Sequence, residues 1–227
     1  MFEVTVAIYA EGSTDNRFLP VIIQRTCTAM LIRHDRFNID VLFPQIIYID
    51  KTKVDSKLDQ CILDAARQAY GYHLLVIHTD GDSGNYQQAR NERFEPGYDL
   101  VQQNQKNVCK ILIPIIPIRM VEAWLLADLE ALKEVLRIST TIRELHNLGL
   151  LEKAKEVEKY KDPKDILLQI IRKIYPRLPE RRHKQILADL YEGLAPIISI
   201  ERLLQVPSYQ QFIRDLEVAF QTLNIIR

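Results

Sequence analysis

The chain has 227 residues, of which 47% are hydrophobic and 26% are charged, the composition of a folded globular protein. Its 30 basic and 30 acidic side chains cancel, so net charge gives no attraction to nucleic acid or membrane, and any basic binding surface must be local. We expect neither a signal peptide nor a membrane span, because the N-terminus has no basic region and no apolar run is long enough. Three scattered cysteines without a CxxC pair favour a reducing, cytoplasmic location.

Strands and helices are expected to alternate in the first part of the chain. Residues 3–10 predict a strand, and Ser13 or Thr14 would then cap a helix that reaches about residue 34. Further expected strands are 40–49, 73–79 and 110–118, and further expected helices are 54–70, parts of 85–106, and 120–136. Pro96-Gly97 breaks the helical pattern and indicates a loop. This alternation predicts an α/β fold with a mostly parallel sheet flanked by helices.

After about residue 138 the pattern becomes helical throughout. The expected helices are 140–148, 163–175, 180–193 and 207–224, separated by prolines. We therefore predict an α/β domain over residues 1–138 and a helical C-terminal region over residues 139–227 that packs on it. The mixed-sign stretch EKAKEVEKYKDPK (152–164) predicts solvent-exposed surface.

Acidic residues directly follow two of the predicted strands. Glu11 follows the first strand, and Asp80 and Asp82 follow the third. These side chains can converge, because the carboxyl ends of parallel strands share one edge of a sheet. Close carboxylates repel one another unless a cation lies between them, and oxygen ligands suit Mg²⁺ or Mn²⁺. Gly81 would let the backbone turn so that both aspartates face the ion. A structural interpretation stays open, since both segments are also good turn or helix-start sequence.

Four motifs in the chain resemble a known group of proteins. EGSTD (11–15) and HTDGD (78–82) resemble the Toprim domain of topoisomerases, bacterial primases and OLD-family nucleases, over about residues 3–130. With EAWLLAD (122–128) and DPK (162–164) added, nearly the whole chain is similar to the domain-of-unknown-function-4276 family, a Toprim-like group. EAWLLAD is the most specific of the four motifs.

The resemblance implies a Toprim fold in which Asp80 and Asp82 bind Mg²⁺. Glu11 would be the general acid/base or a further ligand, and Asp15 and Glu122 would complete a two-metal site. It also implies a setting in prokaryotic defence against phages or mobile elements, with a partner protein that controls cleavage. Metal ions held by carboxylates can supply the activated water and the charge stabilisation that phosphodiester cleavage needs.

Several residues near these motifs have two open interpretations. Arg119 faces a phosphate or neutralises nearby carboxylates, and His78 contacts the site or is a hydrogen-bonded structural residue. We expect Trp124 to pack in the core and Asp128 to be structural. The most basic stretch either follows a nucleic-acid backbone or forms a solvated helix face, and contains Arg177, Arg181, Arg182, His183 and Lys184.

The leading hypothesis is a Mg²⁺-dependent enzyme that cleaves phosphodiester bonds of DNA or RNA. An alternative, favoured by the neutral net charge, is a non-catalytic subunit that binds nucleic acid or a protein partner and keeps the Toprim shape. A third hypothesis is a metal-dependent phosphatase or nucleotidyl transferase that acts on small substrates. A haloacid-dehalogenase-type phosphatase is disfavoured, because Glu11 occupies the position of its nucleophilic aspartate. The oligomeric state stays open.

Overall fold

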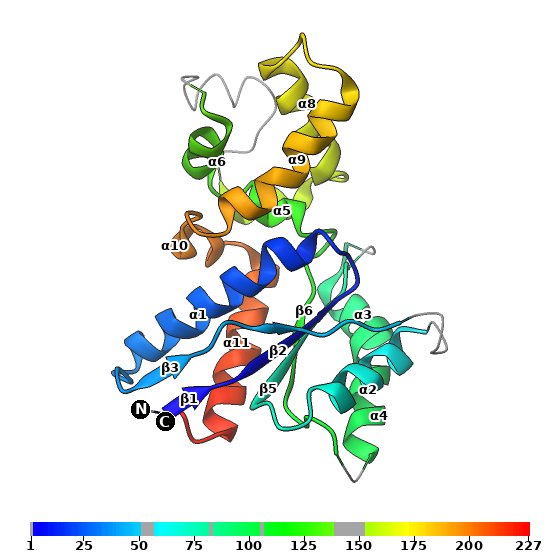
Figure 1. Ribbon diagram of the computed structural model, residues 1–227, viewed down its shortest axis with the longest axis vertical. Coiled ribbons are helices and arrows are strands. Elements are labelled where there is room, and N and C mark those ends of the chain that lie inside the picture. Colours follow the sequence, from blue (N-terminus) through cyan, green and yellow to red (C-terminus); the bar gives the residue numbers. More distant parts are fainter. Residues whose placement is uncertain (1, 51–56, 82–83, 105–106, 139–152) are drawn as a thin grey trace.

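The computed structural model describes residues 2–50, 57–81, 84–104, 107–138 and 153–227 (Figure 1). Four parallel strands form a sheet in the order β4 (Gln45–Ile46), β2 (Val6–Ala10), β5 (Leu74–His78) and β6 (Leu112–Ile115). A two-stranded parallel sheet pairs β1 (Phe2–Val4) with β3 (Ile39–Val41). Together with the helices described below, this arrangement confirms the predicted fold class, an α/β protein with a mostly parallel sheet.

The first expected strand, 3–10, is divided at Thr5. The backbone N–H of Thr5 donates to Nδ1 of His73 at 3.0 Å, and the N–H of His73 donates to Oγ1 of Thr5 at 3.2 Å. The chain therefore changes partners there, because β1 pairs with β3 whereas β2 pairs with β4 and β5. The strand expected over 40–49 is likewise two short strands, with Pro44 between them.

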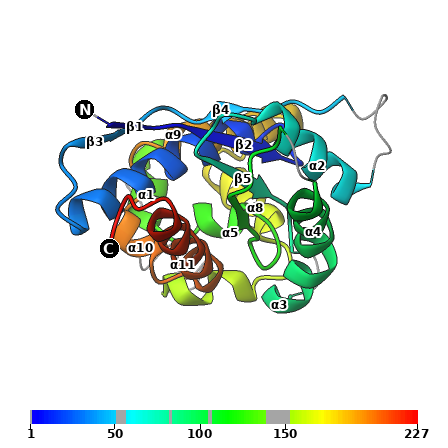
Figure 2. The same cartoon turned by 90° about the horizontal axis from the view of Figure 1, so that it is seen from below.

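Helices cover both faces of the four-stranded sheet (Figure 2). One face is covered by α1 (Leu19–Arg33) and α11 (Pro207–Thr222). The other is covered by α2 (Leu58–Gln68) and α4 (Glu95–Gln103). Helix α4 continues a short helix α3 (Tyr86–Ala89) and a π-helical turn η2 (Arg90–Phe94).

The strands contribute to a separate hydrophobic core on each face, because successive side chains of a strand point in opposite directions. Ile8 and Val76 belong to the larger core with α1 and α11, whereas Tyr9 and Ile77 belong to the smaller core with α2 and α4. Burial on both faces explains why β5 is a continuous apolar run without alternation.

The first helix begins later than expected. A 3₁₀ turn, η1 (Asp15–Arg17), follows Thr14, and α1 starts at Leu19 with Pro20 in its first turn. Thr14 makes no side-chain capping hydrogen bond. The predicted cap at Ser13 or Thr14 is therefore wrong, and the extra turn carries Asp15 toward the end of the sheet.

The loop expected at Pro96-Gly97 is also wrong, because both residues lie in the first turn of α4. Proline is tolerated there, since the first backbone N–H groups of a helix have no partner within the helix. Gly97 is buried against α2, and a Cβ added at Gly97 would lie 2.6 Å from Cδ1 of Ile62. The glycine permits close packing of the two helices.

The helix expected over residues 120–136 is two helices, α5 (Glu122–Leu125) and α6 (Leu129–Leu136). Asp128 separates them. Its Oδ1 accepts a hydrogen bond from the N–H of Ala131 at 3.2 Å, which caps α6, and its Oδ2 accepts one from the N–H of Ser199 at 2.9 Å. Asp128 thus has the structural role that we expected.

After Arg137, the described residues form helices and contain no strand. These are η3 (Ala154–Lys159), α8 (Pro163–Ile174), α9 (Glu180–Leu194), α10 (Ile200–Leu203) and α11. The helix expected over 140–148 lies outside the described residues. Figure 1 shows α6, α8 and α9 beyond the carboxyl ends of the strands, while α11 returns along the sheet. The larger core contains residues from both parts of the chain.

Candidate functional site

The loops after β2 and β5 meet at one edge of the sheet. Ala10 pairs with His78, so Glu11 and Thr79 begin the two loops at the same level. The second loop also contacts the chain beyond β6, because the N–H of Gly81 donates to the carbonyl oxygen of Pro117 at 2.9 Å. A Cβ at Gly81 would lie 2.5 Å from that oxygen. Gly81 is therefore needed for close backbone approach, and no positive φ angle contributes.

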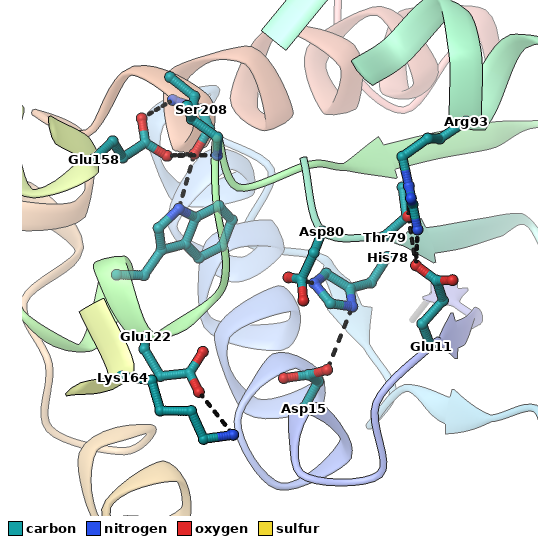
Figure 3. Close-up of polar contacts among 12 residues, drawn as sticks. Glu11, Asp15, His78, Thr79, Asp80, Arg93, Glu122, Glu158, Lys164 and Ser208 are labelled. Atoms are coloured by element: carbon teal, nitrogen blue, oxygen red, sulfur yellow. Dashed lines mark hydrogen bonds and ion pairs between the residues drawn. The ribbon is translucent and has the colours of Figure 1, made fainter. Parts of the chain in front are cut away.

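His78 lies between two of the predicted acidic residues (Figure 3). Its Nδ1 is 3.6 Å from Oδ2 of Asp15, and its Nε2 is 3.5 Å from Oδ1 of Asp80. The imidazole is completely buried. Neither ring nitrogen, nor Oδ1 of Asp80, has a hydrogen-bond partner among the described residues. His78 thus belongs to the candidate site, where its two ring nitrogens face the carboxylates of Asp15 and Asp80.

The acidic side chains influence one another's protonation. Burial lowers the pKa of His78, but Asp80, Asp15 and Glu11 outweigh it, and the net shift is upward. Burial raises the pKa of Asp15 to about 6; Asp80 and Glu122 add to this rise, whereas His78 and Lys164 oppose it. Negative charge is therefore concentrated at this edge of the sheet.

Gly12 explains how Asp15 reaches the histidine. A Cβ added at Gly12 would overlap Oδ2 of Asp15. The carboxylate of Asp15 therefore occupies the space that a side chain at position 12 would need. This contact explains the order of residues in the EGSTD motif. The strand ends before Glu11, Gly12 leaves room for a carboxylate, and the 3₁₀ turn brings Asp15 back toward His78.

Glu11 is held by two partners. Its Oε2 accepts a hydrogen bond from Oγ1 of Thr79 at 2.6 Å and another from Nη2 of Arg93 at 2.7 Å. Nε of Arg93 also donates to Oγ1 of Thr79 at 2.7 Å. Figure 3 shows the carboxylate of Glu11 turned toward Arg93, whereas Asp15 and Asp80 face His78. If Glu11 bound a metal ion, its carboxylate would either contact the ion and Arg93 together or lose its ion pair with Arg93.

Glu122 reaches the same region from α5. Its side chain is only 7% exposed, and its Oε1 lies 3.6 Å from Nζ of Lys164 in α8. The hydroxyl of Tyr191 in α9 is a further neighbour: burial raises its pKa, and the charges of Glu122, Asp15 and Asp80 raise it further. The structure therefore places both Asp80 and Glu122 within electrostatic range of Asp15.

Asp82 lies outside the described residues, so its predicted place beside Asp80 has no structural description. Among the residues that are described, no three histidine, cysteine or acidic side chains already stand close enough together to hold an ion. The donor set nevertheless fits a hard divalent cation. Oδ1 of Asp80 is buried next to His78 and accepts no hydrogen bond from the described residues, and Asp15 is a second carboxylate in contact with the same imidazole.

The predicted basic residues are in two places. Arg119 is half-buried and lies next to Gly84, where an added Cβ would be 3.4 Å from its Nη2. Arg181, Arg182 and Lys184 are exposed at the start of α9. His183, in the same stretch, is buried, and its Nε2 lies 2.9 Å from the carbonyl oxygen of Tyr175. The basic stretch is therefore an exposed helix face interrupted by one structural histidine.

Glu158 is a buried residue that the sequence did not indicate. It lies in the stretch 152–164 that was expected to be surface, which is wrong at this position. Its Oε1 accepts hydrogen bonds from the N–H of Ile118 at 3.1 Å and from the hydroxyl of Ser208. Nε1 of Trp124 donates to the same Ser208 hydroxyl at 2.8 Å. Glu158 thus connects η3 with α11 and, through Ser208, with α5, to one side of the Asp80–His78 pair (Figure 3).

Arg93, Lys164 and Tyr191 were not among the predicted site residues. Each is distant in sequence from its acidic partner, and local spacing cannot pair such residues. Lys164 had one signal, since it belongs to the DPK motif at the start of α8.

Comparison with known proteins gives no relative. No family model, curated protein or solved structure matches this chain. Within the described residues, no helix has the length and apolar character needed to cross a membrane.

Proposed function

We propose that this protein is a Mg²⁺- or Mn²⁺-dependent nuclease with a Toprim-like catalytic edge, which cleaves phosphodiester bonds of DNA or RNA. The observation that carries the proposal is the contact of Asp15 and Asp80 with the two ring nitrogens of the buried His78, with Glu122 within electrostatic range of Asp15. Such concentrated negative charge is costly without a cation, and perturbed acidic residues at the carboxyl edge of a parallel sheet are typical of a functional site.

Asp80 and Asp15 would hold the ion, with Asp82 and Glu122 as further ligands. A bound divalent ion would polarise the phosphodiester and activate a water molecule. Glu11 would serve as the proton acceptor, and its contacts with Thr79 and Arg93 keep the carboxylate in one orientation. Cytoplasmic location, a role in defence against phages or mobile elements, and control by a partner protein are part of the same proposal.

The second candidate is a non-catalytic subunit that binds nucleic acid or a protein partner. One observation favours it. Arg93 already pairs with Glu11, and Lys164 already pairs with Glu122, so the protein itself neutralises part of the acidic charge. This candidate predicts no turnover with any divalent ion.

The test is cleavage of single- and double-stranded DNA and RNA with Mg²⁺ or Mn²⁺, comparing the wild type with Asp80→Asn. Asparagine keeps the shape of the side chain and removes its charge. We expect the rate to fall by at least about 100-fold, because even the loss of a residue that only supports a metal ligand costs about 10- to 100-fold.

The matched control is Asp99→Asn, which makes the same chemical change at an exposed position of α4. It should cleave like the wild type, and both variants should keep the wild-type melting temperature to within a few degrees. Equal rates for wild type and Asp80→Asn would refute the proposed mechanism. Absence of cleavage by the wild type on every substrate would favour the binding subunit.

A further inference from the structure

A groove between α8 and α9 opens beside the carboxylates. It has a volume of about 340 Å³ and is lined by Thr14, Lys164, Leu168, Lys184, Leu187, Ala188 and Tyr191. Three of these residues connect it to the candidate site. Thr14 immediately precedes Asp15, Lys164 pairs with Glu122, and Tyr191 lies in the field of the same carboxylates. The groove therefore lies next to the acidic edge of the sheet.

The groove has an apolar floor and cationic ends. Lys184, Leu187, Ala188 and Tyr191 are spaced by three and four residues, so they share one face of α9. Lys164 and Leu168 share one face of α8 in the same way. Lys164 is 55% exposed at the end near Glu122, and Lys184 is exposed. Among the described residues, Lys184 has no hydrogen-bond or ion-pair partner.

The basic character continues outward along α9. Arg181 precedes Lys184 by three residues, and so it lies one turn further along the same face and is also exposed. From Tyr191 to Lys184 the helix rises about 10 Å, and from Lys184 to Arg181 about 5 Å more. Lys184 and Arg181, about 5 Å apart along the helix axis, can therefore contact phosphates of an extended chain that leads away from the acidic edge.

We infer that this groove binds a segment of single-stranded nucleic acid that leads into the acidic edge. Lys184 and Arg181 contact backbone phosphates, and the floor of Leu168, Leu187 and Ala188 contacts a base or sugar. Single strands are favoured over duplexes because only their bases are free to lie against such a surface. The inference rests on the proposed function in one respect, because it takes the bound strand to be the substrate of the nuclease. Lys164 lies where this strand would reach Glu122.

The test measures binding without chemistry. A fluorescein-labelled single-stranded oligonucleotide is titrated with protein in EDTA, so neither metal binding nor cleavage contributes to the anisotropy signal. The variant is Lys184→Glu. The control is Lys173→Glu, because Lys173 is exposed on α8, nine residues from Lys164, and therefore on the opposite side of that helix.

We expect Lys184→Glu to weaken binding by at least about tenfold and to lower the slope of log affinity against log salt by about one unit or more. Lys173→Glu should bind like the wild type. Equal affinity for wild type and Lys184→Glu would overturn the inference, as would equal weakening by both variants or no binding by the wild type.

These outcomes are separable from those of the nuclease test. If Lys184→Glu binds normally while cleavage by the wild type requires Asp80, the groove inference is wrong and the proposed nuclease stands. If Lys184→Glu loses binding while the wild type cleaves nothing, the groove binds nucleic acid in a non-catalytic subunit.

Discussion

At Gly12, a methyl group in place of the hydrogen would overlap the carboxylate of Asp15. The aspartate side chain can rotate away, so Gly12→Ala should change the melting temperature little but move Asp15 from His78. We expect the affinity for Mn²⁺ to fall by about 10- to 100-fold, the usual cost of disturbing a residue that orients a metal site. Calorimetric titration measures it.

Ser13→Ala is the control for Gly12→Ala, because Ser13 is the exposed neighbour and makes no hydrogen bond with the described acidic residues. It should bind Mn²⁺ like the wild type. If Gly12→Ala also bound like the wild type, the contact between Gly12 and Asp15 would not position a metal ligand.

The protonation of Glu158 should make the stability of the protein depend on pH. Burial raises its pKa above the ordinary value of 4.5, although hydrogen bonds from Ser208 and Ile118 oppose the rise. The folded state then binds the proton more tightly than the unfolded state. The contribution of Glu158 to the free energy of unfolding is therefore fully present below about pH 4.5 and declines as pH rises through the raised pKa.

Glu158→Gln removes this titration and places an amide group where the N–H of Ser208 donates to the carboxylate. At neutral pH we expect it to lower the free energy of unfolding by about 1–3 kcal/mol. The cost should be larger near pH 4 than near pH 7, as measured by urea denaturation. A cost that grew with pH would mean that the hydrogen bonds outweigh burial at this carboxylate.

Only part of the site follows from local sequence. Asp15 was expected at the site only from the family resemblance, whereas Glu11 and Asp80 could be placed at one edge because each follows the end of a strand. Glu158 could not, because its surroundings in sequence are charged on both sides, and its burial depends on Ser208 and Ile118, 50 and 40 residues away. Arg93 could not be paired with Glu11 for the same reason.

On the scale of elements, the contact between α2 and α4 depends on Gly97. A Cβ there would lie within 3.0 Å of three atoms of Ile62, which is itself completely buried. Gly97→Ala improves helix propensity by up to about 1 kcal/mol, but overpacking of a core typically costs about 1–3 kcal/mol. We therefore expect a net loss of stability in chemical denaturation.

Asp99→Ala in the same helix is the matched control, because it gains propensity at an exposed position without a new contact. It should be as stable as the wild type or slightly more stable. If Gly97→Ala were also more stable, α2 and α4 would have room to separate.

Helices with one clear apolar face were predicted closely, and α8, α9 and α11 begin at the expected residues. The errors have specific causes. Asp128 divides α5 from α6 because a capping side chain interrupts an apolar pattern that looks continuous. Pro96-Gly97 was expected to be a loop because the pattern cannot show that the proline is in a first turn and the glycine is in a helix contact.

On the scale of the whole molecule, the last helix of the chain packs on the sheet that contains the early strand β2. Helix α11 follows the helical part in sequence, yet Phe212, Leu216 and Phe220 belong to the same core as Ile8 and Val76. Sequence periodicity gives the apolar face of α11 but not its partner. The expected division at residue 138 therefore describes the order of elements along the chain, while the larger core joins its two parts.

The central claim is that the acidic edge binds a divalent ion through Asp80. The most direct measurement is calorimetric titration of Mn²⁺ and Mg²⁺ into the wild type, Asp80→Asn and the exposed control Asp99→Asn. We predict binding by the wild type and the control, and a loss of at least about tenfold in affinity for Asp80→Asn. Indistinguishable titrations for wild type and Asp80→Asn, with or without binding, would contradict the claim.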